Sequence, residues 1–176
     1  MQPPIFGRAA ILAIIGLCTA GRIARADSSD EQYRNDDGGY TIAFADTPDE
    51  STMHKQVGDL TLTVHMEMVH NANPGMAYAV AYVNMGRDFS LDDIAPSMIR
   101  AMTGQLGAPD STSQVNVDGE QGKEFIFHPE SSFIRIRIFS HHHFLYTVLD
   151  VGPQSEEGAV EDLHFVNSFQ FIDQQN

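Results

Sequence analysis

The chain contains little cysteine, no tryptophan and few basic residues. Its 176 residues include one cysteine, Cys18, and ten lysines and arginines against 24 aspartates and glutamates, which gives a formal net charge of -14. A strongly acidic protein repels phosphate backbones and anionic lipid surfaces. Because no cluster of basic residues interrupts this charge, the composition argues against nucleic acid and anionic membrane surfaces as partners.

Motifs of several enzyme classes are also missing. The sequence has no Gly-x-Ser-x-Gly nucleophile motif and no glycine-rich phosphate loop between a strand and a helix. Its paired acids, such as Asp92-Asp93 and Glu156-Glu157, fall at expected helix starts, where carboxylates complement the helix dipole. We therefore expect neither catalysis nor a cofactor.

An apolar run near the N-terminus is too short to cross a membrane. Residues Ala9–Leu17 follow an arginine and precede small and polar residues that end at Ala26, a pattern typical of a cleaved secretory signal. A membrane-spanning helix needs about 20 apolar residues. A lipoprotein with lipid on Cys18 is the alternative, but Leu17 stands before it, where a small residue is wanted. We expect cleavage near Ala26 and a periplasmic or secreted protein without membrane insertion.

The chain divides into three segments. Residues 1–26 are the predicted signal peptide. Residues 27–38 are polar and acidic with a single aromatic side chain, so they bury too little apolar area to order and form a flexible acidic leader. Residues 39–173 form a single α+β domain. A domain of about 150 residues buries roughly 70% of the surface that its unfolded chain exposes, which is sufficient without a disulfide.

The stretch from Gly122 to Gly152 has the clearest pattern. Three β-rich runs are separated by Pro-Glu-Ser-Ser and by three histidines, which predicts an antiparallel three-strand meander. In the middle run Ile134, Ile136 and Ile138 alternate with two arginines. Alternation of this kind indicates a strand that buries its isoleucines and turns its arginines to water.

Other strands are expected before and after this meander. Tyr40–Phe44 and Met76–Met85 have strand composition, Thr52–Val57 is a weaker candidate, and Leu60–Met68 alternates most regularly. In this last strand every second residue is apolar and is assigned to the core. The intervening side chains are assigned to the solvent face, and they are Thr61, Thr63, His65 and Glu67. Gln114–Val117 and Lys123–His128 flank a turn and predict a hairpin.

Two helices are expected as well. Apolar residues recur every four positions at Ile94, Met98, Met102 and Leu106, which predicts an amphipathic helix. A cap at Ser90 begins this segment. Because proline is unfavourable inside a helix, the regular helix is expected to begin at about Pro96. A short helix begins at Ser155, and the closing strand is Ser168–Ile172.

The order of these elements and several segments resemble a known fold. The segments GYTIAFADTP, GKEFIF, FIRIRIFSHHHFLYTV and HFVNSFQF lie between Gly39 and Ile172. Together they resemble small exported bacterial proteins of the PsbP-like fold. The resemblance implies an antiparallel β-sheet flanked by helices on both sides, an α/β/α sandwich. Most members of this superfamily are binding or assembly factors, one of them an extrinsic photosystem subunit, and the resemblance implies no site residue.

Three consecutive histidines, His141 to His143, are the most distinctive local feature. They fall in an expected hairpin turn, where only His141 and His143 share a face. One hypothesis is a transition-metal site completed by His65, His128 or a nearby acid. The other is an exposed polar turn with weak, adventitious metal affinity. We favour the second, because no further pair of ligands is clustered in the sequence.

Arg135 and Arg137 stand out in a chain with so few cations. Two guanidinium groups on one strand face could bind a carboxylate or phosphate ligand. Alternatively they pair with acids on adjacent strands, and the available acids are Glu67, Glu124 and Glu130. We favour such pairing, which contributes up to about 1 kcal/mol for an exposed pair.

Three functions remain open. The first is a non-catalytic exported domain that binds an envelope protein partner or helps to assemble an envelope complex. The second is a periplasmic transition-metal-binding protein that uses His141 and His143. The third is a hydrolase with an unrecognised site. An apolar groove or aromatic patch would favour the first, converging histidines the second, and a deep pocket with perturbed carboxylates the third. The oligomeric state is open.

Overall fold

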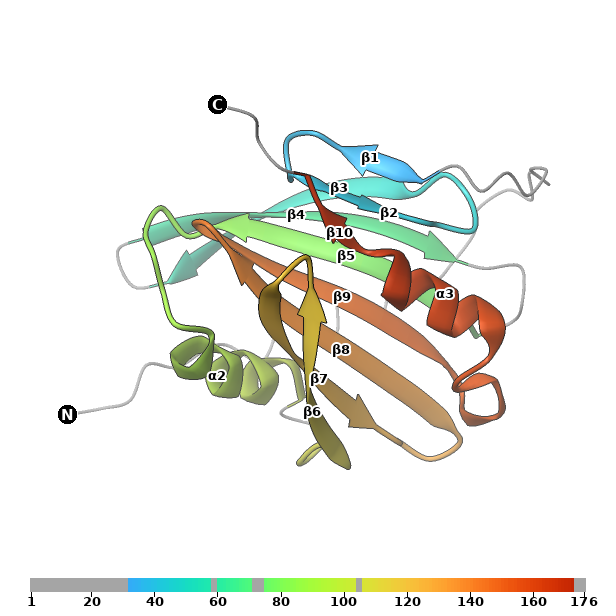
Figure 1. Ribbon diagram of the computed structural model, residues 1–176. Helices are drawn as coiled ribbons and strands as arrows, with labels where there is room; N and C mark the ends of the chain where they lie inside the picture. Colours follow the sequence, from blue (N-terminus) through green and yellow to red (C-terminus); the bar gives the residue numbers. More distant parts are fainter. Residues whose placement is uncertain (1–31, 58–59, 71–74, 104–105, 173–176) are drawn as a thin grey trace.

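The computed structural model describes residues 32–57, 60–70, 75–103 and 106–172, which form two antiparallel sheets and the helices that pack on the larger one (Figure 1). The large sheet has the strand order β3-β4-β5-β9-β8-β7-β6 and the small sheet has the order β1-β2-β10. The large sheet comprises β3 (Asp49–Val57), β4 (Leu60–His70), β5 (Ala77–Asn84), β6 (Ser111–Val117), β7 (Glu120–Phe127), β8 (Ser132–His141) and β9 (Phe144–Pro153). The small sheet comprises β1 (Tyr33–Asn35), β2 (Tyr40–Ile42) and β10 (Gln170–Phe171). The helices are α2 (Leu91–Thr103), α3 (Val160–Ser168) and the 3-10 turn η1 (Gln154–Glu156).

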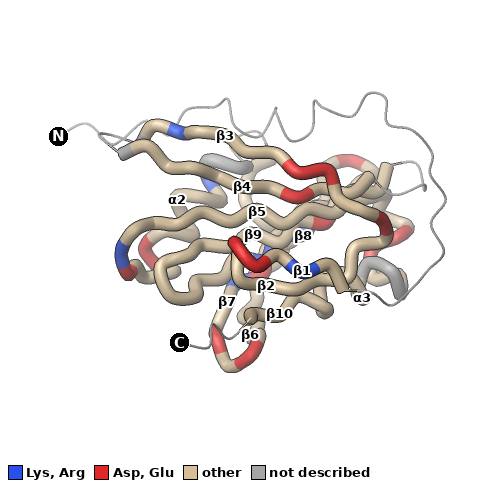
Figure 2. Tube along the Cα trace, turned by 90° about the horizontal axis from the view of Figure 1, so that it is seen from above, with Lys and Arg blue, Asp and Glu red and all other residues tan. Residues whose placement is uncertain are grey.

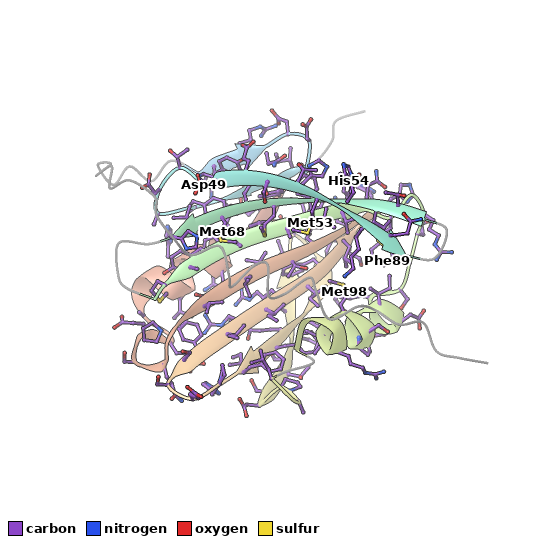
Figure 3. All side chains as sticks on the ribbon, turned by 180° about the vertical axis from the view of Figure 1, so that it is seen from behind. Asp49, Met53, His54, Met68, Phe89 and Met98 are labelled. Carbon is purple, nitrogen blue, oxygen red and sulfur yellow. The ribbon has the colours of Figure 1, made fainter. Side chains whose placement is uncertain are left out.

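The large sheet is covered on both faces. Helix α2 packs on one face, where Ala95 and Ile99 join the buried isoleucines of β8 (Figure 3). Helix α3 and the small sheet pack on the opposite face (Figure 1). The expected architecture of an antiparallel sheet flanked by helices is therefore confirmed, with the small sheet as an additional element. Within the described ranges, neither helix is long and apolar enough to cross a membrane.

The predicted meander is present as β7, β8 and β9. Two of the hairpins have two-residue turns: Asp118-Gly119 joins β6 to β7 just before the meander, and His142-His143 joins β8 to β9 within it. Asp118 and Gly119 have φ of 53° and 89°. Positive φ at both central residues is what the tight hairpin turn requires, and Asp-Gly accommodates it. The hairpin is thus tighter than the expected five-residue turn.

The arginine-bearing face of β8 is buried, contrary to the expectation that it faces water. Ile136 is 2% exposed, as predicted, but Arg135 is only 5% exposed. On the same face as the arginines, Phe133 and Phe139 are fully buried against the α3 side of the sheet. An alternating pattern indicates which residues share a face, but it does not reveal that a second layer covers the polar one.

The predicted leader is partly structured. Tyr33–Asn35 form β1, which pairs antiparallel with β2, and the prediction that residues 27–38 form a flexible leader is wrong for this part. The single aromatic residue of the segment explains the difference. The Tyr33 ring lies 5.5 Å from that of Phe44 and 6.5 Å from that of Tyr40, so it anchors the strand by aromatic packing. Residues 27–31 and the predicted signal peptide lie outside the described residues.

The helices differ from the expectation at their starts. Helix α2 begins at Leu91 and contains Pro96, whereas the sequence placed the regular helix from about Pro96. Pro96 is exposed, and because it has no N–H the helix lacks the hydrogen bond that this residue would donate. Helix α3 begins at Val160 after η1, which contains Ser155, and the closing strand is only Gln170–Phe171.

Candidate binding cleft

The histidine turn does not form a shared ligand set. His141 Nδ1 lies 3.2 Å from Glu120 Oε1, and the His141 ring stacks on Phe171 with centroids 4.4 Å apart. His143 Nδ1 lies 3.0 Å from Asp88 Oδ1. The two histidines therefore contact different acids. Among the described residues, no three or more His, Cys, Asp or Glu side chains are grouped so that they could hold a metal ion.

The other two histidines named for that site also have separate neighbours. The ring of His65 stacks on Tyr82, with centroids 4.9 Å apart. His128 lies between two carboxylates, 2.7 Å from Glu157 Oε2 and 3.1 Å from Asp110 Oδ2. The hydrogen bond with Glu157 is the main cause that raises the pKa of His128, and the bond with Asp110 adds to it. His128, directly after β7, thus ties the residue that follows η1 to the residue that precedes β6.

Arg137 pairs with an acid on the adjacent strand, as the favoured interpretation predicted. Its Nε donates to Glu124 Oε2 at 2.7 Å, and Glu124 faces Arg137 directly in the β7–β8 register. Its Nη1 donates to the Val166 carbonyl at 2.7 Å and to Asn167 Oδ1 at 3.0 Å. Both acceptors lie on α3, so the guanidinium group joins this helix to the sheet.

Arg135 is bound in the same layer, partly by an acid that the sequence did not single out. Its Nη1 lies 3.1 Å from Asp150 Oδ2, and its Nε lies 3.8 Å from Glu124 Oε2. Asp150 faces Arg135 in the β8–β9 register and is fully buried. The Arg135 guanidinium also lies over the ring of Phe133 at 5.6 Å. Both arginines thus form ion pairs and hydrogen bonds within the protein.

The structure reveals a buried carboxylate that the sequence assigned to solvent. Glu67 on β4 is only 4% exposed. Its Oε2 accepts a hydrogen bond of 2.7 Å from the Tyr40 hydroxyl, and its Oε1 accepts one of 2.6 Å from Asn35 Nδ2. Both donors come from the small sheet, which covers this part of β4. The regular alternation of β4 does not indicate that a second sheet covers its polar face.

Glu67 lies in a polar cleft of about 300 Å³ between the two sheets. The cleft is formed by β1 and the turn that follows it, together with β3, β4 and β5. Its lining residues are Tyr33, Arg34, Asn35, Asp36, Asp37, Glu50, Ser51, Thr52, His65, Glu67 and Tyr82. Figure 2 shows acidic segments on β3, on β4 and at the turn between β1 and β2.

A second hollow of about 390 Å³ continues from this cleft. It shares Asp37, His65 and Tyr82 with the first and extends toward Asn84 and Phe144. The stacked rings of His65 and Tyr82, with 11° between their planes, lie at the junction of both hollows. A ligand longer than a single side chain would therefore extend from one hollow into the other.

The cleft carries a negative charge. Asp36, Asp37, Glu50 and Glu67 line it, whereas its only basic residue besides histidine, Arg34, donates to Asp36 Oδ1 at 2.7 Å. Burial raises the pKa of Glu67, and the nearby Glu50 carboxylate adds to this, although the hydrogen bonds from Tyr40 and Asn35 act in the opposite direction. An acidic cleft with a low dielectric wall attracts cations.

Tyr33 and Tyr40 donate hydrogen bonds to carboxylates at the cleft and are not anions. Burial is the largest cause that raises the pKa of Tyr33, Tyr40 and Tyr82 above the ordinary value for tyrosine. The Tyr33 hydroxyl donates to Glu50 Oε1 at 3.0 Å, which raises its pKa further. These donors orient the carboxylates at two points of the cleft.

The layered arrangement of one large antiparallel sheet with α2 on one face, and α3 and the small sheet on the other, defines the PsbP-like fold. The structure is similar to the solution structure of cyanobacterial PsbP from Synechocystis, with a TM-score of 0.50 at 10% sequence identity, over 89% of this chain and 99% of that one. It is also similar to the crystal structure of PA94 from Pseudomonas aeruginosa, a protein of unknown function, with a TM-score of 0.41 at 9% identity, over 61% of this chain and 90% of that one. No protein-family model and no curated protein matches the chain.

Proposed function

We propose that this chain is an exported, non-catalytic binding protein of the bacterial envelope, and that its cleft accepts a basic segment of a protein partner. The observation that supports this most is the polar cleft itself, with Glu67 held at its base and acids at its rim. Export is supported by the N-terminal pattern that ends at Ala26.

A lysine or arginine side chain fits the chemistry of the cleft. The carboxylates of Asp37 and Glu50 would accept charge-assisted hydrogen bonds from such a side chain. The rings of Tyr82 and His65 offer a flat surface on which a guanidinium group stacks. The formal net charge of -14 would accelerate the approach of a basic partner, because electrostatic steering raises association rates.

A hydrolase is the second candidate, because Glu67 is a carboxylate with a raised pKa beside a cleft. Two observations favour binding over hydrolysis. Both Glu67 oxygens accept hydrogen bonds from Tyr40 and Asn35, and the side chain is almost fully buried. A general acid or base must reach the proton of its substrate, and these bonds hold Glu67 away from that task.

A binding experiment with a defined probe tests the cleft. We would titrate a labelled peptide of alternating lysine and arginine into wild type and into Asp37→Asn/Glu50→Gln, and measure Kd by fluorescence anisotropy at two salt concentrations. The matched control is Asp93→Asn/Glu130→Gln, which removes the same charge at two exposed positions outside the cleft. We expect the cleft variant to bind about tenfold or more weakly, which corresponds to about 1.4 kcal/mol, and the control to bind within about threefold of wild type.

Equal weakening in both variants would mean that the peptide responds only to net charge, and would refute the cleft as its site. If the cleft variant alone binds more weakly, proteins captured from the source envelope by wild type but not by that variant would identify the partner. Hydrolysis of ester or peptide substrates that is lost in Glu67→Gln would favour the hydrolase. Intact-mass analysis of the exported chain tests the export proposal, with a mature start at Asp27 expected and an acylated start at Cys18 refuting it.

A further inference from the structure

Strand β3 forms an open edge of the large sheet. It stands first in the strand order and has β4 as its single neighbour in the described part of the chain. It has nine residues, and its side chains from Asp49 to Gln56 are all exposed or half-buried. Figure 2 shows β3 along the outer margin of the sheet. The outer side of such a strand presents backbone N–H and C=O groups that can pair with another strand.

The charges of β3 are separated along its length. Asp49 and Glu50 lie at its start, and His54 and Lys55 lie toward its end, as Figure 3 shows for Asp49 and His54. The register with β4 assigns each charge to a face. Asp49 and Lys55 face Met68 and Leu62, so they share the α2 side of the sheet, whereas Glu50 and His54 face Glu67 and Thr63 on the side of the cleft.

We propose that β3 pairs antiparallel with β3 of a second copy of this chain, about a two-fold axis at Thr52. In this register Asp49 lies opposite Lys55 of the second copy, and Glu50 lies opposite His54 of the second copy. Residues that lie opposite each other in an antiparallel pair share a face, so Asp49 and Lys55 bring opposite charges together on the α2 side, and Glu50 lies opposite the imidazole of His54 on the cleft side. The two-fold axis makes every such contact twice.

Other registers of the same strand lose this complementarity. A shift of the axis to Met53 places Asp49 opposite Val57 and Glu50 opposite Gln56, with no charged pair formed. Parallel pairing in register would place each acid beside its own copy and each base beside its own copy, which is unfavourable. The antiparallel register about Thr52 is therefore the one that the charge pattern of β3 selects.

The proposed dimer would join two large sheets into one and keep corresponding faces on the same side. The two clefts would then open on one side of the dimer, because the two-fold axis is perpendicular to the sheet. Glu50 belongs both to the cleft and to this edge, so the two binding sites would lie close to the interface. Backbone hydrogen bonds along the strand provide the affinity in this mode of association, and side chains provide the register.

The oligomeric state tests the proposal. Sedimentation of the full chain at physiological salt should show a dimer whose dissociation constant rises at least tenfold in Lys55→Glu. The exchanged variant Asp49→Lys/Lys55→Glu should restore the wild-type constant, because it reverses both members of the pair. Arg87→Glu is the matched control, with the same change of charge at an exposed loop position, and should leave dimerisation unchanged.

A second measurement guards against a loss of folding in the charge variants. In a chain with Cys18→Ser, Thr52→Cys should form a disulfide-linked dimer under mild oxidation, because the proposed axis places the two thiols opposite each other. Met53→Cys should crosslink far less, since it lies off the axis. A monomeric wild type, a dimer unaffected by Lys55→Glu, a failed exchange or equal crosslinking at both positions would overturn the proposal.

Discussion

Arg137→Ala is expected to destabilise the protein far more than an exposed arginine would. The substitution removes the 2.7 Å hydrogen bond to Glu124 and the 2.7 Å hydrogen bond to the carbonyl of Val166. The Glu124 side chain is 14% exposed, so water reaches it poorly once the guanidinium is gone. The Val166 carbonyl lies near the end of α3, where carbonyl groups lack partners within the helix.

The magnitude follows from these losses. A buried polar group left without a partner costs about 1–3 kcal/mol, and removal of one member of a buried ion pair costs about 3–5 kcal/mol. Arg135 lies 3.8 Å from Glu124 in the variant as well, so its guanidinium group still offsets part of the carboxylate's buried charge. We therefore expect a loss of about 2–4 kcal/mol in the free energy of unfolding. Ile136→Ala should cost about 2–5 kcal/mol through its cavity, so the two neighbouring positions should be similar.

Urea unfolding monitored by circular dichroism measures these values directly. Arg87→Ala, at an exposed loop position, serves as the control and should stay within about 0.5 kcal/mol of wild type. A double-mutant cycle of Arg137→Ala with Glu124→Gln should give a coupling of about 1 kcal/mol or more. A loss below about 1 kcal/mol in Arg137→Ala would refute the reasoning, because it would place this side chain in water.

Three further predictions concern titration and metal. Because burial raises the pKa of Glu67, wild type should lose stability as pH rises from the ordinary carboxyl pKa through the raised one, whereas thermal melts of Glu67→Gln should show a flatter dependence. Since Glu157 raises the pKa of His128, its stabilisation is present below about pH 6.5 and is lost as pH rises through the raised pKa; His128→Gln should therefore be less stable than wild type at pH 6, with a smaller difference at pH 9. Calorimetry with zinc should give weak binding without a rise in Tm, and submicromolar affinity that His141→Ala/His143→Ala abolishes would show a metal site instead.

The strands of the meander could be predicted because local rules determine them. Ile134 to Ile138 alternate, and turn residues separate the runs, so the pairing of neighbours along the chain followed directly. Glu124 was found as a partner of the arginines for the same reason, since β7 precedes β8. Asp150 was not, because it required the register between β8 and β9, which spacing alone does not define.

The cleft could not be predicted, because it depends on contacts between distant segments. Glu67 reads as a solvent residue in the alternation of β4, and only the position of the small sheet brings Tyr40 and Asn35 to it. The segment that contains Asn35 reads as a flexible leader by composition. Its single tyrosine, Tyr33, was the one residue that indicated order. The average composition of the segment does not register the effect of one aromatic residue.

The small sheet is assembled from both ends of the domain, and this determines when its central strand is fully packed. Its middle strand, β2, pairs with β1 on one side and with β10 on the other, so that Tyr40 lies opposite Phe171. A chain that emerges from its N-terminus delivers β10 last. Closing so long a loop is slow, because the entropy is lost before the contact forms. Tyr40, which donates to Glu67, is therefore fully packed only when the last segment of the domain has been made, because the Phe169 ring stacks on it with centroids 5.4 Å apart.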